Sequence, residues 1–262
     1  QVRQQWGPTA AASASSPTHA QGASLVRLVE LVYPQPAWRV LDVATAAGHT
    51  ALAFAPHVAG VVGLDLTPEM LPHAARLAAE RGAANVAWAA GDVDDLPFGE
   101  GAFDLVTCRI AAHHFADVSR FLAEAARVLR SGGRLALVDN VVPGSRLRGK
   151  RADRERTAGD YVNAFEKLRD PSHVRCLSVE QWHDALAAAG LVVEAAEMLD
   201  KRLTFETWVA RAGGGTAAPE MATRLRAMLL QAPEAARAFL DPRVEGVTSF
   251  RLREGLFIAR RP

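Results

Sequence analysis

The chain has 262 residues, of which 30 are basic and 29 acidic, so its formal net charge is +1. This near-neutral balance argues against nucleic acid or an anionic membrane as a partner. Hydrophobic residues make up 49% of the chain, which is enough to build one large α/β domain. The chain has two cysteines, no apolar run that could span a bilayer and no signal-peptide pattern, so we expect a reduced cytoplasmic protein.

The first predicted helix runs from Leu25 to Val32, with Ser24 as its candidate N-cap. A short buried strand over residues 40–43 follows. The small residues Ala44, Ala46 and Gly48 then lead into a second helix near Thr50. A strand that turns into a helix through small residues brings backbone N–H groups close to a ligand. A tight turn in an unrelated α/β protein would produce the same pattern.

An acidic residue stands at or just after the end of each of the first three predicted strands. Asp42 closes the first strand, and Asp65 ends the second, which covers residues 61–66. Asp65 stands where doubly wound folds place an acid to accept hydrogen bonds from ribose hydroxyls, about twenty residues after the small-residue loop. A solvated acid at a strand end is the alternative. The third strand, residues 86–90, leads into Gly91-Asp92 and then Leu96-Pro97-Phe98.

Two more strands complete the predicted parallel part of the sheet. The fourth covers residues 103–109 and is followed by a helix that Asp117 can cap. Ser131-Gly132-Gly133 is expected to end that helix, and the fifth strand covers residues 134–138. Strands that alternate with helices at this spacing predict a doubly wound sheet.

These motifs resemble those of class I S-adenosylmethionine (SAM) dependent methyltransferases, in the methyltransferase type 11 family near the ubiquinone and menaquinone C-methyltransferases. The loop after the first strand resembles their Asp-x-Gly-x-Gly-x-Gly motif, with Ala44 and Ala46 in place of two glycines. Because alanine disfavours a positive φ angle, we expect an ordinary backbone at both positions. The segment from Gly91 to Phe98 resembles the adenine-binding motif of this family.

The resemblance implies a Rossmann-like, doubly wound, seven-stranded and mostly parallel sheet, with helices on both faces and a small helical cap. It also implies SAM as cofactor, with Asp92 and the Val93 N–H at the adenine ring. The first 33 residues are expected to cover the cofactor as a lid, in which Trp6 and His19 are candidate contacts or packing residues. The residues expected to bind the cofactor are Asp42, Ala44, Ala46, Gly48, Asp65, Leu66, Met70, Asp92, Val93, Arg109 and His114.

Three histidines are candidate general bases because imidazole titrates near neutral pH. His113 and His114 follow the fourth strand, and His173 lies in a phrase, residues 169–175, that resembles a segment of the same bacterial branch. Hydrogen bonding that shapes the loops is the alternative for all three. The residues expected to bind the acceptor are Asp139, Asn140, Tyr161, His173 and Arg175.

An Asp139-Asn140 pair at a strand end is also compatible with a magnesium ion, which prefers oxygen ligands. The corresponding position of the fourth strand is Arg109, whose charge would repel a cation, so we expect no metal. The basic segment from residue 143 to 170 alternates acids and bases, as a solvated helix face does, with an anionic acceptor as the alternative.

We expect one domain over residues 1–262, with a lid (1–33), a SAM-binding core (38–142) and two segments that cover the acceptor (143–176 and 201–248). The predicted function is methyl transfer to the O, C or N atom of a small molecule, a secondary metabolite or quinone-like precursor, by a monomer or homodimer. The alternatives are a non-catalytic SAM-binding protein, a SAM-bound enzyme of another reaction and, further off, a nucleic-acid methyltransferase.

Overall fold

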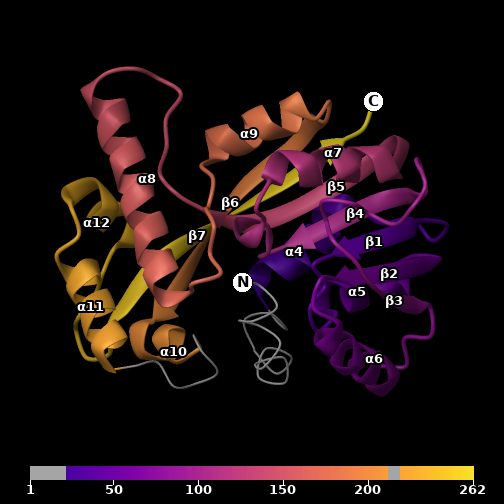
Figure 1. Cartoon of the computed structure of the whole chain (residues 1–262), viewed down its shortest axis with the longest axis horizontal. Coiled ribbons are helices and arrows are strands. Elements are labelled where there is room, and N and C mark those ends of the chain that lie inside the picture. Colours follow the sequence, from indigo (N-terminus) through magenta and orange to yellow (C-terminus); the bar gives the residue numbers. More distant parts are fainter. Residues whose placement is uncertain (1–21, 212–218) are drawn as a thin grey trace.

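A computed structural model describes residues 22–211 and 219–262 of the chain (Figure 1). Its centre is one seven-stranded sheet in the order β3-β2-β1-β4-β5-β7-β6. The first five strands pair in parallel, and β7 is antiparallel to both of its neighbours. The strands are β1 (Arg39–Val43), β2 (Gly60–Asp65), β3 (Val86–Ala90), β4 (Phe103–Arg109), β5 (Leu129–Val141), β6 (Val192–Thr204) and β7 (Ser249–Arg260). The predicted fold class is confirmed.

Helices cover both faces of the parallel part, because its strands are apolar on both sides (Figure 1). One layer packs on a core that contains Val40, Leu105 and Val138, and the other on a core that contains Leu41 and Leu137. The first layer comprises α4 (Ala23–Val32), α5 (His49–Phe54) and α6 (Leu71–Glu80), and the second comprises α7 (Val118–Val128) and α9 (Val179–Ala188). None of the helices in the described part of the chain is both long and apolar enough to cross a membrane.

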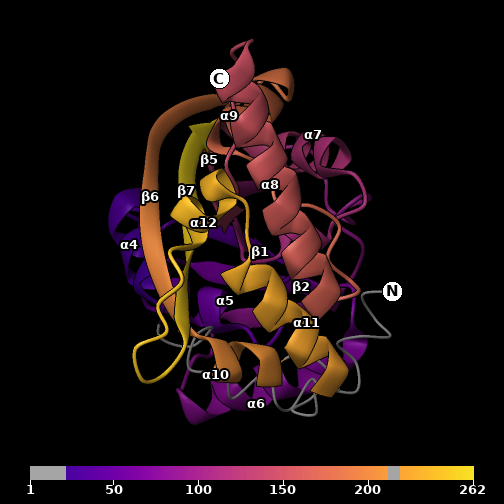
Figure 2. The same cartoon turned by 90° about the vertical axis from the view of Figure 1, so that its left-hand side faces the viewer.

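The remaining helices form a cap beside the extended ends of β6 and β7 (Figures 1 and 2). They are α8 (Lys150–Arg169), α10 (Phe205–Ala210), α11 (Pro219–Leu230) and α12 (Glu234–Leu240). A separate apolar core holds this cap, with Phe165 stacked on Trp208 at 4.7 Å and edge-on to Phe250. The chain between β6 and β7, which falls in the segment 201–248, thus contains α10–α12.

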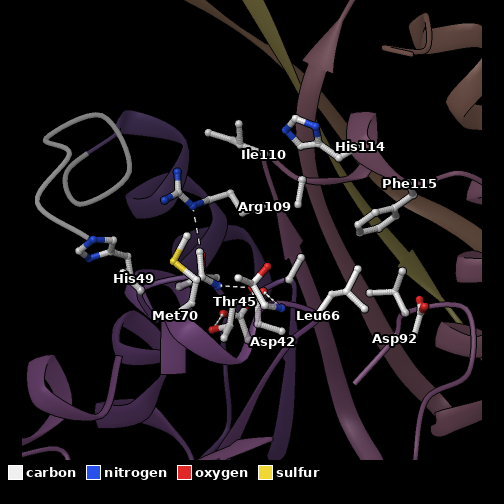
Figure 3. A pocket seen from close by; sticks show the side chains of 18 of the residues that line it. Asp42, Thr45, His49, Leu66, Met70, Asp92, Arg109, Ile110, His114 and Phe115 are labelled. Atoms are coloured by element: carbon white, nitrogen blue, oxygen red, sulfur yellow. Dashed lines mark hydrogen bonds between the residues drawn. The ribbon is translucent and has the colours of Figure 1, made fainter. Parts of the chain in front are cut away.

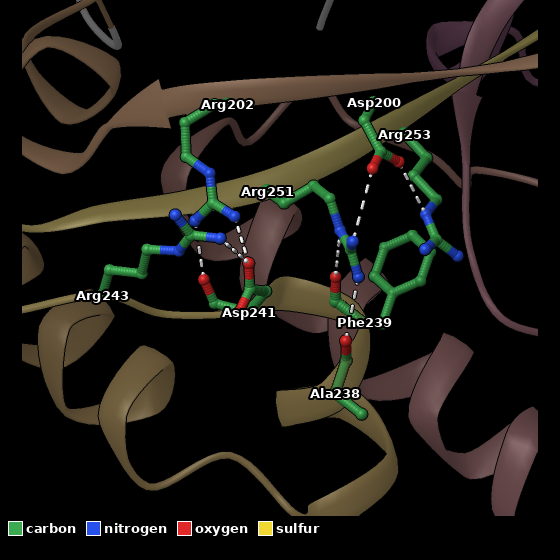
Figure 4. Close-up of polar contacts among 8 residues, drawn as sticks. All are labelled: Asp200, Arg202, Ala238, Phe239, Asp241, Arg243, Arg251 and Arg253. Carbon is green, nitrogen blue, oxygen red and sulfur yellow. Dashed lines mark hydrogen bonds and ion pairs between the residues drawn. The ribbon is translucent and has the colours of Figure 1, made fainter.

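Arginines of the antiparallel strands β6 and β7 bind the end of α12 (Figure 4). Arg251 donates to the carbonyl oxygens of Ala238 and Phe239, which have no partner within the helix. Asp241 ends the helix with φ 43°, and its carboxylate pairs with Arg202 and Arg243. These contacts hold the small helix to the sheet.

The helix ends confirm the predicted cap at Asp117 and correct the one at Ser24. Asp117 accepts from the amides of Ser119 and Arg120, and Ser178 forms a capping box at α9. Ser24 is not an N-cap, because α4 begins one residue before it. Thr67 makes no side-chain cap; Pro68 to Met70 form a 3₁₀ turn before α6.

Candidate functional site

A cavity of about 280 Å³ lies where β1, β2 and β4 end at the same edge of the sheet (Figure 3). Doubly wound sheets bind ligands at this edge. Ten of the eleven predicted cofactor residues line the cavity, and Gly48 does not. The cavity also involves residues that the sequence did not single out, including Thr45, His49, Thr50, Ile110 and Phe115.

Asp42 anchors the loop that forms the floor of the cavity. Its Oδ2 accepts from Thr45 Oγ1 at 2.6 Å and from the amide of Ala51 at 3.1 Å, and its Oδ1 accepts from Thr107 Oγ1 at 2.7 Å. Burial raises the pKa of Asp42 to about 6, although these hydrogen bonds lower it. The carboxylate thus joins β1, its loop, α5 and β4, and it is committed mainly to holding the loop in shape.

Ala44 and Ala46 adopt the left-handed backbone that the glycines of such a motif favour. The expectation of an ordinary backbone, with negative φ, at these two positions was wrong. Ala44 has φ 52° and Ala46 has φ 47°. The amide of Ala46 donates to Asp65 Oδ2 at 2.7 Å and that of Thr45 donates to the carbonyl of Leu64 at 3.0 Å. These bonds to β2 impose the left-handed conformation, which an alanine adopts at some cost.

A third strained residue closes the opposite wall. Ile110 has φ 55°, an outlier for a β-branched side chain, and its amide donates to the carbonyl of Val138 at 2.7 Å. Three of the five non-glycine residues with positive φ in the described ranges therefore line this one cavity: Ala44, Ala46 and Ile110. Strained backbone of this kind concentrates at functional sites.

Two further acids, Asp65 and Asp92, line the cavity, and Asp92 lies on a different side of it from Arg109 (Figure 3). Asp65 is buried, accepts from the amides of Ala46 and Thr67, and has its pKa raised by burial. Asp92 is exposed and accepts from the amide of Asp94 at 3.1 Å. Each carboxylate oxygen can accept a second hydrogen bond, so both acids retain capacity for a ligand.

Arg109 supplies the positive charge of the cavity. Its Nε donates to Thr50 Oγ1 at 3.1 Å. Burial lowers the pKa of the guanidinium, and the charges of Glu254 and Asp42 oppose that effect. Arginine remains charged under such conditions, so this end of the cavity favours an anionic ligand group.

The chain resembles known proteins along most of its length. Residues 41–137 match the model of a methyltransferase domain family. YcgJ, an uncharacterized methyltransferase of Bacillus subtilis, is 38% identical over 194 residues, which are 74% of this chain and 73% of YcgJ. The crystal structure of YcgJ has a TM-score of 0.82 and 33% identity, covering 91% of this chain and 97% of that one.

Other relatives agree with this match. A crystal structure of a Bacillus halodurans protein has a TM-score of 0.83 at 36% identity, covering 92% of this chain and all of that one. The demethylmenaquinone methyltransferase of Thermus thermophilus is 41% identical over 115 residues, 43% of this chain and 52% of the relative. The chain belongs to the methyltransferase family. It has the class I fold, for which SAM is the expected cofactor.

Of the three predicted histidine bases, one borders the cavity of this methyltransferase. His114 lines it, and its Nδ1 lies 3.1 Å from Ser172 Oγ, which in turn donates to Asp170 at 2.6 Å. Burial, followed by the positive charge of His113, lowers the pKa of His114 to about 4. His114 is therefore neutral at physiological pH.

His113 lies behind the cavity wall, with its Nδ1 at 2.5 Å from Asp139 Oδ1. Burial opposes a charge on this ring, but the carboxylate of Asp139 outweighs burial and raises the pKa of His113. The backbone oxygen of His113 accepts from the amides of Val174 and Arg175. The two histidine-bearing segments, distant in sequence, are thus joined into one unit.

The predicted acceptor residues do not line this cavity. Asp139 is committed to His113, and His173 is buried with its Nε2 at 2.9 Å from Asn163 Oδ1. Tyr161 donates to the carbonyl of Met228 within the cap, and exposed Arg175 faces Asp160 at 3.5 Å. Within the described ranges, no group of three or more His, Cys, Asp or Glu side chains could hold a metal ion. Trp6 and His19 lie outside the described residues.

Proposed function

We propose that this methyltransferase binds SAM in the cavity at the ends of β1, β2 and β4. The observation that carries this proposal is the polar lining of the cavity, which contains Asp65, Asp92 and Arg109. Asp92 and Arg109 lie on different sides of it (Figure 3). The acids fit the hydroxyl and amino donors of a nucleoside, and the arginine fits the carboxylate of an amino acid. The left-handed loop between them lets backbone approach the ligand as a glycine loop does.

When bound, SAM supplies a methyl carbon that its sulfonium makes electrophilic. The chain then has to hold the acceptor in line with that carbon and to exclude water. His114 and Ile110 form the wall next to Arg109, and we assign them to the side that the acceptor approaches. His114 is uncharged above about pH 4, so it does not repel the sulfonium.

The acceptor that we propose is a small molecule, of the secondary-metabolite or quinone-precursor class. The near-neutral charge of the chain favours this over nucleic acid, and a demethylmenaquinone methyltransferase is among its relatives. We further propose one domain that acts in the cytoplasm as a monomer or homodimer. In it, residues 38–142 bind the cofactor, and 143–176 and 201–248 cover the acceptor. Most of the lid expected over residues 1–33 lies outside the described residues.

Transfer of labelled methyl groups tests this proposal. The protein would be incubated with methyl-labelled SAM and separately with a low-molecular-weight bacterial extract, total RNA and denatured cell protein. We expect label in the small-molecule fraction and S-adenosylhomocysteine (SAH) as co-product. Label confined to RNA or protein would overturn the assignment of the acceptor.

A further inference from the structure

A buried chain of hydrogen bonds reaches the cofactor cavity through His114. The ring of His114 lines the cavity, and its Nδ1 lies 3.1 Å from Ser172 Oγ. Ser172 Oγ lies in turn 2.6 Å from Asp170 Oδ1, which also accepts from the amide of Ser172 at 2.9 Å. Ser172 and Asp170 are both buried, and neither lines the cavity. They therefore act on a ligand in the cavity only through the histidine.

The short contact between Ser172 and Asp170 fixes the position of the hydroxyl proton. Two oxygen atoms 2.6 Å apart repel each other unless a proton lies between them. Burial raises the pKa of Asp170, but the hydrogen bonds from Ser172 and nearby positive charges outweigh burial and lower this pKa. The carboxyl group is therefore ionised at neutral pH, and the proton between the two oxygens belongs to Ser172.

The serine oxygen in turn fixes the proton of the histidine ring. A hydroxyl group has one proton, and Ser172 donates it to Asp170, so its oxygen can only accept from Nδ1 of His114. Nδ1 must then carry the ring proton. Nε2 lies 4.0 Å from Asp170 Oδ2, which is too far for a hydrogen bond that would draw the proton to Nε2.

The ring holds only this one proton at neutral pH. Burial, followed by the positive charge of His113, lowers the pKa of His114 to about 4. The charges of Asp170 and Asp139 act in the opposite direction and are outweighed. In a neutral imidazole one nitrogen donates and the other accepts, so Nε2 is the hydrogen-bond acceptor of this ring.

The backbone ties the two ends of this chain of groups together. The carbonyl oxygen of His113 accepts from the amides of Val174 and Arg175, which joins the loop of His114 to the segment that carries Ser172. The predicted acceptor-covering segment thus meets the cavity at the histidine ring.

We propose that Ser172 and Asp170 are positioning residues that keep the proton of His114 on Nδ1 and thereby present Nε2 to the methyl acceptor. The acceptor that fits Nε2 is protic, with an O–H or N–H group at the atom to be methylated. The sequence singled out His173 and Arg175 of this segment, whereas the structure links Ser172 and Asp170 to the cavity. The role toward the acceptor rests on the proposed function, because it takes the cavity as the cofactor site.

NMR of the histidine rings tests the assigned proton directly. Protein with isotopically labelled histidine, saturated with SAH at pH 7, gives ring correlations that distinguish protonated from unprotonated nitrogens. The signals of His114 are those that disappear in His114→Gln. We expect a protonated Nδ1 and an unprotonated Nε2. A proton on Nε2, alone or together with one on Nδ1, would overturn the inference.

Ser172→Ala shows whether the hydroxyl group fixes the proton. The variant removes the oxygen that accepts from Nδ1, so in most rings the proton of His114 should move to Nε2, toward the carboxylate of Asp170. Ser131→Ala is the control, because this exposed hydroxyl group donates to the carbonyl of Pro262, and it should leave the ring signals unchanged. A ring still protonated at Nδ1 in Ser172→Ala would contradict the inference.

Methyl transfer shows whether the position of the proton matters for the reaction. Ser172→Ala should slow the labelling of small molecules from methyl-labelled SAM by about tenfold or more, while its affinity for SAH stays within about threefold of the wild type. Ser131→Ala should keep the wild-type rate. An unchanged rate in Ser172→Ala, or a parallel loss of SAH affinity that shows Ser172 merely shaping the cavity, would count against the inference. Failure of the wild type to bind SAH, or to label small molecules, would instead overturn the proposed function and leave the proton assignment standing.

Discussion

At the scale of single residues, the cofactor loop shows how tertiary hydrogen bonds override a local preference. Ala44 and Ala46 replace motif glycines, and alanine alone favours negative φ. The structure nevertheless gives both a left-handed backbone, because the amides of Thr45 and Ala46 donate to β2. The sequence showed the motif, but it could not show that these long-range bonds dictate its shape.

The strain in this loop leads to a stability prediction. Ala46→Gly removes the strain of a left-handed alanine, which stabilises the fold by roughly 1–2 kcal/mol. The greater flexibility of glycine in the unfolded chain opposes this by about 0.5–1 kcal/mol. We expect urea denaturation to show between no change and a gain of about 1 kcal/mol in the free energy of unfolding. Ala47→Gly, at a buried neighbour without positive φ, should lose stability. A clear loss of stability in Ala46→Gly would contradict the backbone strain assigned to Ala46.

His114 predicts a dependence of stability on pH. Its pKa is about 4 in the folded chain and 6.5 as a free side chain, so between these values the unfolded chain binds the extra proton. The stability that the neutral His114 contributes is complete above pH 6.5 and is lost as the pH falls toward 4. When the pH falls from 7 to 5, the free energy of unfolding should therefore drop by about 1–2 kcal/mol less in His114→Gln than in the wild type. Denaturant unfolding at the two pH values measures this difference, and equal losses would contradict it.

At the scale of elements, the observed boundaries differ from the predicted ones where backbone groups pair with residues far away in the sequence. Ser131 to Gly133 were expected to end a helix, but they lie within β5, which runs from Leu129 to Val141. The amide of Gly132 donates to the carbonyl of Arg261, and the amide of Arg261 donates to Gly133. The chain terminus supplies these partners, and local sequence patterns do not reveal them.

The attachment of α12 can be tested at the same scale. Arg251 is mostly buried and satisfies two carbonyls at the end of this helix, whereas Arg243 is 67% exposed (Figure 4). Arg251→Met should cost about 1–2 kcal/mol, because it removes the hydrogen bonds to the part-buried carbonyl of Phe239 and the exposed carbonyl of Ala238. Arg243→Met should change stability by less than about 0.5 kcal/mol. Denaturant titrations of the two variants check this, and equal effects would refute the assigned role of Arg251.

At the scale of the whole molecule, the parallel sheet was predictable because its buried strands are apolar runs between clear turn signals. The expected cofactor residues came together because the ends of parallel strands share one edge. The cap was less predictable. Its helices pack through Phe165, Trp208 and Phe250, which are far apart in sequence, and this arrangement draws Tyr161 into the cap and away from the cavity.

The central claim is that the cavity at the ends of β1, β2 and β4 holds SAM, and calorimetric titration tests it most directly. SAM and SAH should bind the wild type with micromolar affinity, and NAD should not bind. Asp65→Ala should weaken both ligands at least tenfold, whereas Glu69→Ala, exposed on the neighbouring turn, should not. Binding of NAD in place of SAM, or an unchanged affinity in Asp65→Ala, would contradict the account.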